Sequence, residues 1–570
     1  MSRKLFALLL LGLTAGTLSA AEPSAGKSAK KPRPPAEQVT RPEELLPRTV
    51  FGVLLGELAL QRGKFDIALG AYVDLARRTQ DARLQERAFE IAMNSRQIEL
   101  ALELARQWSQ RDPESIKARL AITTALMLLN RTDELGEHIA RMLEADKPRL
   151  ADNLMHLNRL LARQTDRQTV SQLIQKVASP YSDLPEAHYA MGLAALSAGD
   201  QALARSASAQ ALTMRPDWER AALLRAQVLA KDSAGEALLL LQDFVAAQPQ
   251  AADARLSLAR LLLSEKRERE SRQQFERVLE MYPESPEALF PAAMLALRQN
   301  DPAAGRKHLE RLLAGPYQDK GTVQYFLGQI AEDEKQFELA LKHYRQVDAG
   351  EHYLGARLRM AVLMTQAGQE DAALKMLAET RTMTAEEKAQ LAMGEAILLR
   401  DSKRYAESYA RLERELKTQP DHPRLLYDAA MAAERNGRFD LLERHLQHLL
   451  KLDPKNAHAL NALGYTLADR NLRLDEAHQL ISKALELTPN DPFIMDSLGW
   501  ALYRQGKLAE ALVTLQAAYK LREDPEIAAH LGEVLWMLER RDEARAIWQS
   551  AAQKHPDNEA LSAVIKKFIP

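Results

Sequence analysis

The feature that most constrains this chain is a pattern of small and apolar residues that occurs three times between positions 461 and 556. In each copy a Leu-Gly pair precedes an alanine and, four residues later, a large apolar residue: Leu498-Gly499 with Ala511 and Leu515, Leu531-Gly532 with Ala544 and Trp548, and Leu463-Gly464 with Ala477 and Ile481. The alanines of the last two copies are 33 residues apart, and the earliest copy has one extra residue between Asn471 and Leu474. A helical hairpin of this length cannot bury its apolar face alone and must stack on neighbouring copies. The pattern therefore predicts an array of stacked hairpins.

Each position of the pattern has a physical role. Gly499 and Ala511 are small because two antiparallel helices cross there, and a larger side chain would force their axes apart. Leu498 and Leu502 recur at helical spacing, which places them on the stripe that faces the partner helix. Gly506 interrupts this stripe and indicates the turn between the two helices.

The same pattern occurs from Phe51 onward, and a unit of about 34 residues is typical of the tetratricopeptide repeat. We expect an all-α fold: a TPR-type helical hairpin solenoid, a superhelix with a concave groove. The repeats occupy residues 49–568 as about 15 hairpins, with 116–180 degenerate and 457–556 most regular. A terminal helix over 558–568 would cover the last apolar face.

The N-terminal residues indicate export. Arg3 and Lys4 precede an apolar run, and small residues near Ala20 suit signal peptidase, so residues 1–21 are predicted to be a signal peptide. Residues 22–48 are rich in Pro and Lys and are predicted to be a linker. Thr17 stands where a bacterial lipoprotein has its lipidated cysteine, so we expect a soluble periplasmic protein without a lipid anchor. No later segment is apolar enough to span a membrane.

Composition and motifs argue against several functions. The formal net charge is −1 and there is no cysteine, which makes nucleic acid binding improbable and excludes disulfides and thiolate metal sites. No catalytic motif, phosphate loop or calcium loop is present, so we expect neither an enzyme nor a cofactor. His445 and His448 lie three residues apart, but no third ligand is suitably spaced, so we interpret both as surface histidines rather than a metal site.

The register of the repeats predicts a partner-binding surface. In this kind of hairpin the first helix lines the concave side, and residues that do not pack within the hairpin point into the groove. Exposed Trp and Tyr combine a large contact area with hydrogen bonding and dominate interface energetics. The alternative for Trp500 and Trp536 is that they pack between adjacent helices. The predicted partner-binding residues are Asn461, Tyr465, Asp496, Trp500, Tyr503, Arg504, Glu533 and Trp536.

The blocks from Asn461 to Ala468 and from Asp496 to Tyr503 closely resemble the C-terminal repeats of bacterial envelope tetratricopeptide proteins. Length, export signal and uninterrupted repeats are similar to the TPR lipoprotein that partners a periplasmic carboxyl-terminal processing protease. This resemblance implies a protein-binding scaffold or adaptor that activates the protease and presents cell-wall hydrolases to it.

A second hypothesis is a TPR factor in polysaccharide or peptidoglycan export or assembly. Rows of aromatic side chains such as Tyr465, Trp500 and Tyr503 can stack on sugar rings. The two hypotheses predict different partners for the same surface, which are a protein in the first case and a glycan in the second.

Overall fold

The computed structural model describes residues 47–79, 81–162 and 166–569. The predicted signal peptide, Thr17 and nearly all of the predicted linker lie outside these residues. The first helix, α1, begins at Pro47, two residues before the expected start of the repeats. No helix within the described ranges is both long and apolar enough to cross a membrane.

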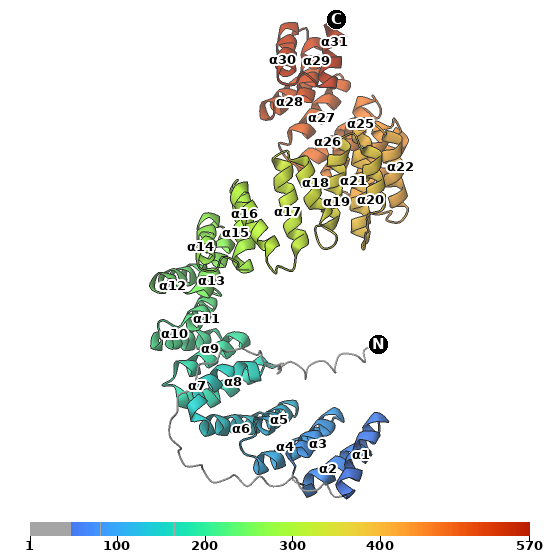
Figure 1. Ribbon diagram of the computed structural model, residues 1–570. Coiled ribbons are helices and arrows are strands. Elements are labelled where there is room, and N and C mark those ends of the chain that lie inside the picture. Colours follow the sequence, from blue (N-terminus) through green and yellow to red (C-terminus); the bar gives the residue numbers. More distant parts are fainter. Residues whose placement is uncertain (1–46, 80, 163–165, 570) are drawn as a thin grey trace, which may run out of the picture. The chain divides into compact units, whose positions relative to one another are not determined.

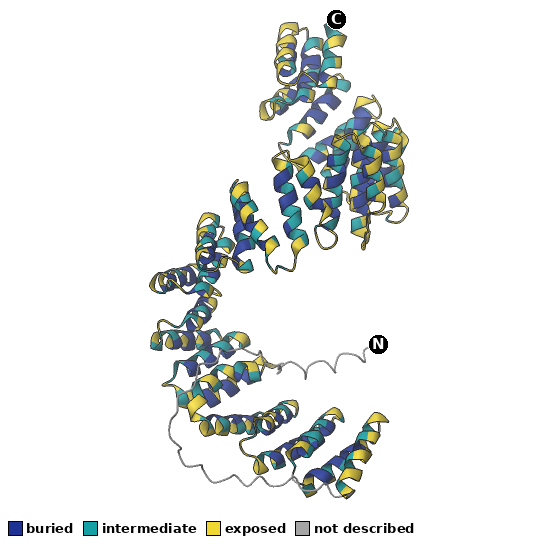
Figure 2. Cartoon of the chain, viewed as in Figure 1, coloured by how far each residue is buried: buried dark blue, intermediate teal, exposed yellow. Residues whose placement is uncertain are grey.

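Every regular element in the described residues is a helix, which confirms the predicted all-α class and the TPR-type hairpin solenoid (Figure 1). The chain divides between Val228 and Leu229 into two compact units. In both units the helices carry a buried stripe on one side and exposed residues on the other (Figure 2). This is the distribution expected for amphipathic helices that stack through one face.

The first unit contains helices α1 to α10 and nearly all of α11, and the region predicted to be degenerate holds α5 to α8. Two short 3-10 helices, Lys147–Arg149 and Ser179–Tyr181, flank α7 and α8. The helices are α1 (Pro47–Gln61), α2 (Phe65–Thr79), α3 (Ala82–Asn94), α4 (Ile98–Arg111), α5 (Ile116–Leu128), α6 (Thr132–Ala145), α7 (Leu150–Leu160), α8 (Arg167–Ala178), α9 (Pro185–Ala198), α10 (Gln201–Met214) and α11 (Glu219–Leu229).

In the second unit, from α13 on, each odd-numbered helix packs on the even-numbered helix that follows it; we call these the first and second helices of a pair. The last helix, α31, packs on α29 and α30. The helices are α12 (Ala234–Ala247), α13 (Ala252–Ser264), α14 (Glu268–Met281), α15 (Pro286–Arg298), α16 (Pro302–Ala314), α17 (Lys320–Asp333), α18 (Phe337–Arg345), α19 (Tyr353–Gln366), α20 (Glu370–Ala378), α21 (Ala385–Asp401), α22 (Tyr405–Leu416), α23 (Pro423–Arg435), α24 (Phe439–Leu452), α25 (Ala457–Asp469), α26 (Leu474–Leu487), α27 (Pro492–Arg504), α28 (Leu508–Leu521), α29 (Pro525–Met537), α30 (Arg541–Lys554) and α31 (Glu559–Phe568).

Glycines of the first helices make room for large side chains of the second helices. A Cβ added at Gly499 would lie 2.5 Å from Leu515 Cγ, and one at Gly532 would lie 2.1 Å from Trp548 Nε1. Both partners are sixteen residues further along the chain, and both are fully buried. The prediction that Gly499 is small because two helices cross there is therefore confirmed.

The turns within the pairs share one backbone conformation. Gly506 ends α27 with a φ of +78°, and the N–H of Lys507 donates to the carbonyl of Leu502 at 2.9 Å. Lys335 and Lys403 have a φ near +60° in the corresponding turns. A residue in the left-handed region ends the first helix, and the N–H of the next residue donates a hydrogen bond back to a carbonyl of that helix. This C-cap lets the chain reverse direction.

The first helices of the last three pairs begin with a side-chain cap. Asp491 accepts hydrogen bonds from two backbone N–H groups of α27, and Asn456 and Asp524 cap α25 and α29 in the same way. Such a cap contributes about 1 kcal/mol because it satisfies N–H groups that have no partner within the helix. The starting points of these helices are thereby fixed, and with them the faces that their side chains occupy.

We expect Gly464→Ala to lower the free energy of unfolding by about 1–3 kcal/mol, as overpacking does. A Cβ at this position would lie 2.6 Å from Ile481 Cγ1 and 2.9 Å from the backbone oxygen of Ala477, which cannot move independently of its helix. Gly235→Ala is the control, because there the nearest atom would be 3.8 Å away. Urea unfolding followed by circular dichroism compares the two variants, and equal effects would contradict the packing role of Gly464.

Candidate partner-binding face

The eight predicted site residues lie on three first helices that are neighbours in space. Asn461 and Tyr465 lie on α25; Asp496, Trp500, Tyr503 and Arg504 lie on α27; and Glu533 and Trp536 lie on α29. We call this set the C-terminal face. Burial divides it into two groups, since Asp496, Trp500 and Glu533 are buried and the other five are half-buried.

Trp500 is a packing residue between repeats. Its side chain is only 6% exposed, and its ring stacks on the imidazole of His530 on α29, with ring centroids 4.2 Å apart. Its indole N–H donates a hydrogen bond to Asp469 at the end of α25, with a donor–acceptor distance of 3.2 Å. Of the two alternatives for Trp500, the structure shows packing between adjacent helices. The ring therefore positions its neighbours and has no open face for a partner.

Asp496 forms an ion pair with His530. Both carboxylate oxygens of Asp496 lie within 3.0 Å of His530 Nδ1, and Asp496 is only 7% exposed. Burial by itself disfavours the charged imidazole, but the carboxylates of Asp496, Glu526 and Glu533 outweigh it and raise the pKa of His530 above its ordinary value of 6.5. The pair joins α27 to α29 in the interior of the C-terminal face.

Glu533 joins α29 to both of its neighbours. Its carboxylate accepts a hydrogen bond from the Tyr503 hydroxyl at 3.1 Å and one from Lys567 Nζ of α31 at 2.9 Å. Burial, followed by the negative charge of Glu533, raises the pKa of Tyr503 to about 12. Because its hydroxyl is held in this way, the Tyr503 ring has a fixed place at the surface.

Trp536 lies at the end of α29 and is half-buried. Its ring stacks on Trp548 of α30 and makes a tilted contact with Phe568 of α31, both with centroids 5.8 Å away. The guanidinium groups of Arg541 and Arg545 lie over it at 5.4 and 5.6 Å. Trp536 therefore packs against the last helix and keeps part of its surface accessible.

The remaining three residues, Asn461, Tyr465 and Arg504, are half-buried on α25 and α27. Tyr465 lies 6.2 Å from His530 between ring centroids, and burial followed by the nearby carboxylates raises its pKa. The guanidinium of Arg504 lies 5.8 Å over the Trp500 ring. The side-chain oxygen of Asn461 is buried and has no hydrogen-bond partner within the described residues.

Sequence reasoning missed three residues that organise this face: Asp469, His530 and Lys567. A usable signal was present, because His530 follows Asp496 by 34 residues and Lys567 follows Glu533 by the same interval. Side chains of opposite charge one repeat apart lie on the same position of successive units. In a stacked array such positions are neighbours, so the pairs were predictable from the register.

The interpretation of His445 as a surface histidine is wrong. His445 is only 5% exposed, and its Nε2 lies 3.2 Å from the Tyr409 hydroxyl and 3.3 Å from a Glu413 oxygen. It lies on the packed side of α24, because the neighbouring pair covers it. His448 is half-buried and its Nε2 lies 2.8 Å from a carboxylate oxygen of Asp421. Across the described ranges no group of three or more His, Asp or Glu side chains is arranged to hold a metal ion.

These features define a helical-repeat scaffold for protein–protein interaction. The sequence pattern of the tetratricopeptide repeat matches residues 233–286, 290–352, 366–441 and 443–492, and a second pattern of the same description matches 502–567. The chain is 32% identical over 518 residues to the TPR repeat-containing protein PA4667 of Pseudomonas aeruginosa, which covers 85% of this chain and 82% of that protein. The chain belongs to the tetratricopeptide repeat family.

Solved structures of tetratricopeptide proteins are also similar to it. The thermophilic TPR protein TTC0263 of Thermus thermophilus is 22% identical with a TM-score of 0.29, over 32% of this chain and 98% of that one. The Cut9–Hcn1 hetero-tetramer of APC/C contains a chain that is 14% identical with a TM-score of 0.33, over 92% of this chain and 97% of that one.

We expect Trp500→Ala to lower the free energy of unfolding by about 3–5 kcal/mol, as truncation of buried aromatic residues does. The substitution removes the stacking on His530 and leaves a cavity between α27 and α29. Val513→Ala on α28 is the control, since Val513 is 68% exposed and its truncation should change stability by less than about 0.5 kcal/mol. If both variants unfold at the same urea concentration, Trp500 is not a packing residue.

The His530–Asp496 pair predicts a pH dependence of stability. Because folding raises the pKa of His530, the pair stabilises the folded protein fully below pH 6.5, and this contribution is lost as the pH rises through the raised value. The stability difference between the wild type and His530→Gln should therefore be larger at pH 6 than at pH 9. Urea unfolding at the two pH values measures this difference, with His555→Gln as an exposed control. A difference that does not change with pH would show that folding does not raise the pKa of His530.

Proposed function

We propose that this chain is a periplasmic adaptor that binds a carboxyl-terminal processing protease and presents cell-wall hydrolases to it. The class of partner follows from the repeat family, whose members bind proteins. The particular partners and the periplasmic location rest on the resemblance of the C-terminal repeats and on the predicted export signal.

The observation that carries the proposal is the fixed arrangement of half-buried side chains on the C-terminal face. Tyr465, Tyr503 and Arg504 keep part of their surface accessible, while Trp500 and Glu533 beneath them are buried and hydrogen-bonded. Side chains ordered before binding lose less conformational entropy when a partner docks. Tyr and Arg are also the residues most enriched at the energetic centres of protein interfaces. The face is therefore suited to a protein partner.

The glycan hypothesis has less support. Sugar stacking requires an open aromatic face, but His530 and Tyr503 lie against the Trp500 ring, and Trp548 and Phe568 lie against Trp536. We therefore favour a protein partner for the C-terminal face.

The direct test reconstitutes the adaptor from purified proteins. The full chain is added to the carboxyl-terminal processing protease of the same bacterium together with one of its cell-wall hydrolases, and the cleavage rate is measured. We expect the chain to accelerate cleavage and Arg504→Glu to reduce this acceleration about tenfold, as loss of an interface hot spot does. Lys507→Glu is the matched control, because it makes the same charge change at an exposed turn residue and should retain the acceleration.

Two results would overturn the proposal. The first is cleavage at the same rate with and without the chain. The second is an equal effect of Arg504→Glu and Lys507→Glu, which would show that the C-terminal face is not the contact. A saturable change of tryptophan fluorescence with glycan fragments, without any effect on the protease, would support the export hypothesis instead.

A further inference from the structure

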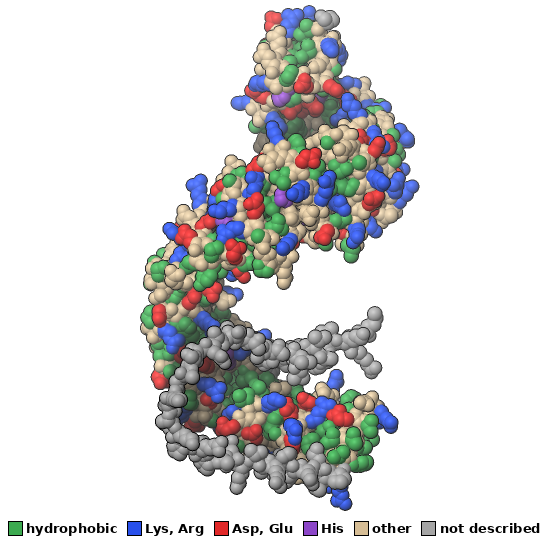
Figure 3. Space-filling view, in the orientation of Figure 1, with side chains coloured by type: hydrophobic (Ala, Val, Ile, Leu, Met, Phe, Trp, Pro, Cys, Tyr) green, Lys and Arg blue, Asp and Glu red, His purple; other side chains and the backbone are tan. Residues whose placement is uncertain are grey.

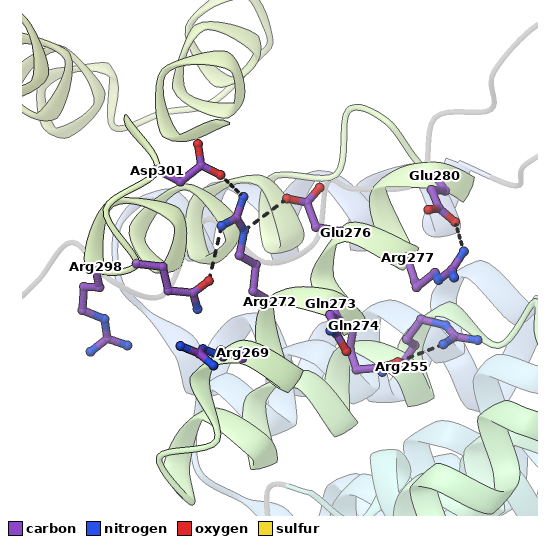
Figure 4. A pocket seen from close by; sticks show the side chains of 11 residues that line it. Arg255, Arg269, Arg272, Gln273, Gln274, Glu276, Arg277, Glu280, Arg298 and Asp301 are labelled. Carbon is purple, nitrogen blue, oxygen red and sulfur yellow. Dashed lines mark hydrogen bonds and ion pairs between the residues drawn. The ribbon is translucent and has the colours of Figure 1, made fainter. Parts of the chain in front are cut away.

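A hollow lined with arginine side chains lies beside α14 in the second unit, away from the residues of the C-terminal face. Its volume is about 1130 Å³. Figure 4 shows that its lining side chains come mainly from α14, with Arg255 from α13 and others from the end of α15 and the turn that follows. Five arginines line it, namely Arg255, Arg269, Arg272, Arg277 and Arg298.

Three of these arginines are neutralised by neighbouring carboxylates. Arg272 forms ion pairs with Asp301 at 2.6 Å and with Glu276 at 3.7 Å. Arg277 pairs with Glu280 at 2.9 Å, and Arg298 pairs with Glu268 of α14 at 3.0 Å. The Arg272–Asp301 and Arg298–Glu268 pairs join α14 to the end of α15 and to the turn that follows it.

The other two arginines have no neutralising partner. No described carboxylate lies within ion-pair distance of Arg255 or Arg269, and Arg269 is exposed. The guanidinium of Arg255 donates to neutral oxygens only, those of Gln274, Val245 and Pro249, and its Nε–H is buried without an acceptor. Burial, and next the positive charge of Arg277, lowers the pKa of Arg255. The hollow therefore carries uncompensated positive charge.

Neutral amide groups complete the lining. Gln273 is exposed beside Arg269, and Gln299 has a buried amide nitrogen without an acceptor. The stretch of α14 from Arg269 to Glu280 is about 16 Å long at 1.5 Å per residue. An extended peptide of about five residues has the same length. Glutamine amides both donate and accept hydrogen bonds, which matches a peptide backbone.

We infer that this hollow binds an acidic, extended segment of a partner protein, in which one Asp or Glu carboxylate pairs with Arg269 and the remaining negative charge is attracted by the positive charge of Arg255. The planar guanidinium of arginine binds carboxylates through two parallel hydrogen bonds. The carboxylates of Glu276, Glu280 and Asp301 in the same walls disfavour the continuous charge of a nucleic acid backbone. Surface charges of both signs are interspersed on the face that Figure 3 shows. This inference rests on one part of the proposed function, namely that the partner is a protein.

The test measures peptide binding to the full chain by fluorescence anisotropy at low salt. The probes are a labelled ten-residue peptide rich in Asp and Glu, its Asn and Gln counterpart, and a single-stranded oligonucleotide of equal charge. The test variant is Arg269→Gln. The matched control is Arg260→Gln on α13, because Arg260 is exposed but lies outside the hollow. Arg269 contacts no described carboxylate, so its replacement should leave the circular dichroism spectrum and the melting temperature unchanged.

We expect saturable binding of the acidic peptide, weakened about tenfold by Arg269→Gln, which is typical for the loss of a charge-assisted hydrogen bond. Arg260→Gln should change the affinity less than about twofold, since exposed charges away from a site are screened. Equal binding of the neutral peptide, tighter binding of the oligonucleotide, or equal effects of the two variants would overturn the inference.

The two proposals can fail separately. A chain that binds the acidic peptide through Arg269 but does not accelerate the protease would overturn the proposed function and leave this site standing. Acceleration of the protease without any binding of the acidic peptide would overturn this site and leave the proposed function standing.

Discussion

The most regular hairpins of this protein depend on one recurring contact between the two helices of a pair. A glycine on the first helix faces a large side chain sixteen residues later on the second, as Gly499 faces Leu515 and Gly532 faces Trp548. In the pair with one extra turn residue the interval is seventeen, from Gly464 to Ile481. Because glycine has no side chain, the two helices approach closely and hold these buried side chains between them. The opposite sides of both helices can then contact neighbouring pairs.

Neighbouring pairs are joined by polar contacts as well as by apolar packing, and these polar contacts shape the C-terminal face. In the last repeats the links between first helices are Trp500 to Asp469, His530 to Asp496 and Tyr503 to Glu533. Similar links between neighbouring pairs occur elsewhere in the chain, where Glu57 of α1 pairs with Arg87 of α3 and Glu332 of α17 pairs with Arg359 of α19. Each of these carboxylates also accepts a hydrogen bond from a tyrosine within its own pair, Tyr72 or Tyr344. Buried charged groups are costly unless their hydrogen-bonding capacity is met, so these links fix the orientation of neighbouring helices. The half-buried residues of the C-terminal face derive their positions from them.

Much of the fold can be predicted from the sequence, but less of the candidate site can be. The repeated Leu-Gly and Ala positions predict the helical pairs because they report on contacts within one hairpin. The register also places all eight candidate residues on three consecutive first helices. It cannot show which of them are buried, because burial of Trp500 depends on His530, one repeat away. The arginine hollow beside α14 is not predictable from the sequence for the same reason, because its walls combine side chains from successive helices whose repeats match the pattern only weakly.

The central claim is that the C-terminal face is the surface through which this scaffold binds its protein partner. Hydrogen–deuterium exchange of the full chain, alone and with the carboxyl-terminal processing protease, tests it most directly. We expect slower exchange on complex formation in peptides that cover α25, α27 and α29. Slower exchange confined to other helices, or no change in any peptide at saturating protease, would contradict the claim.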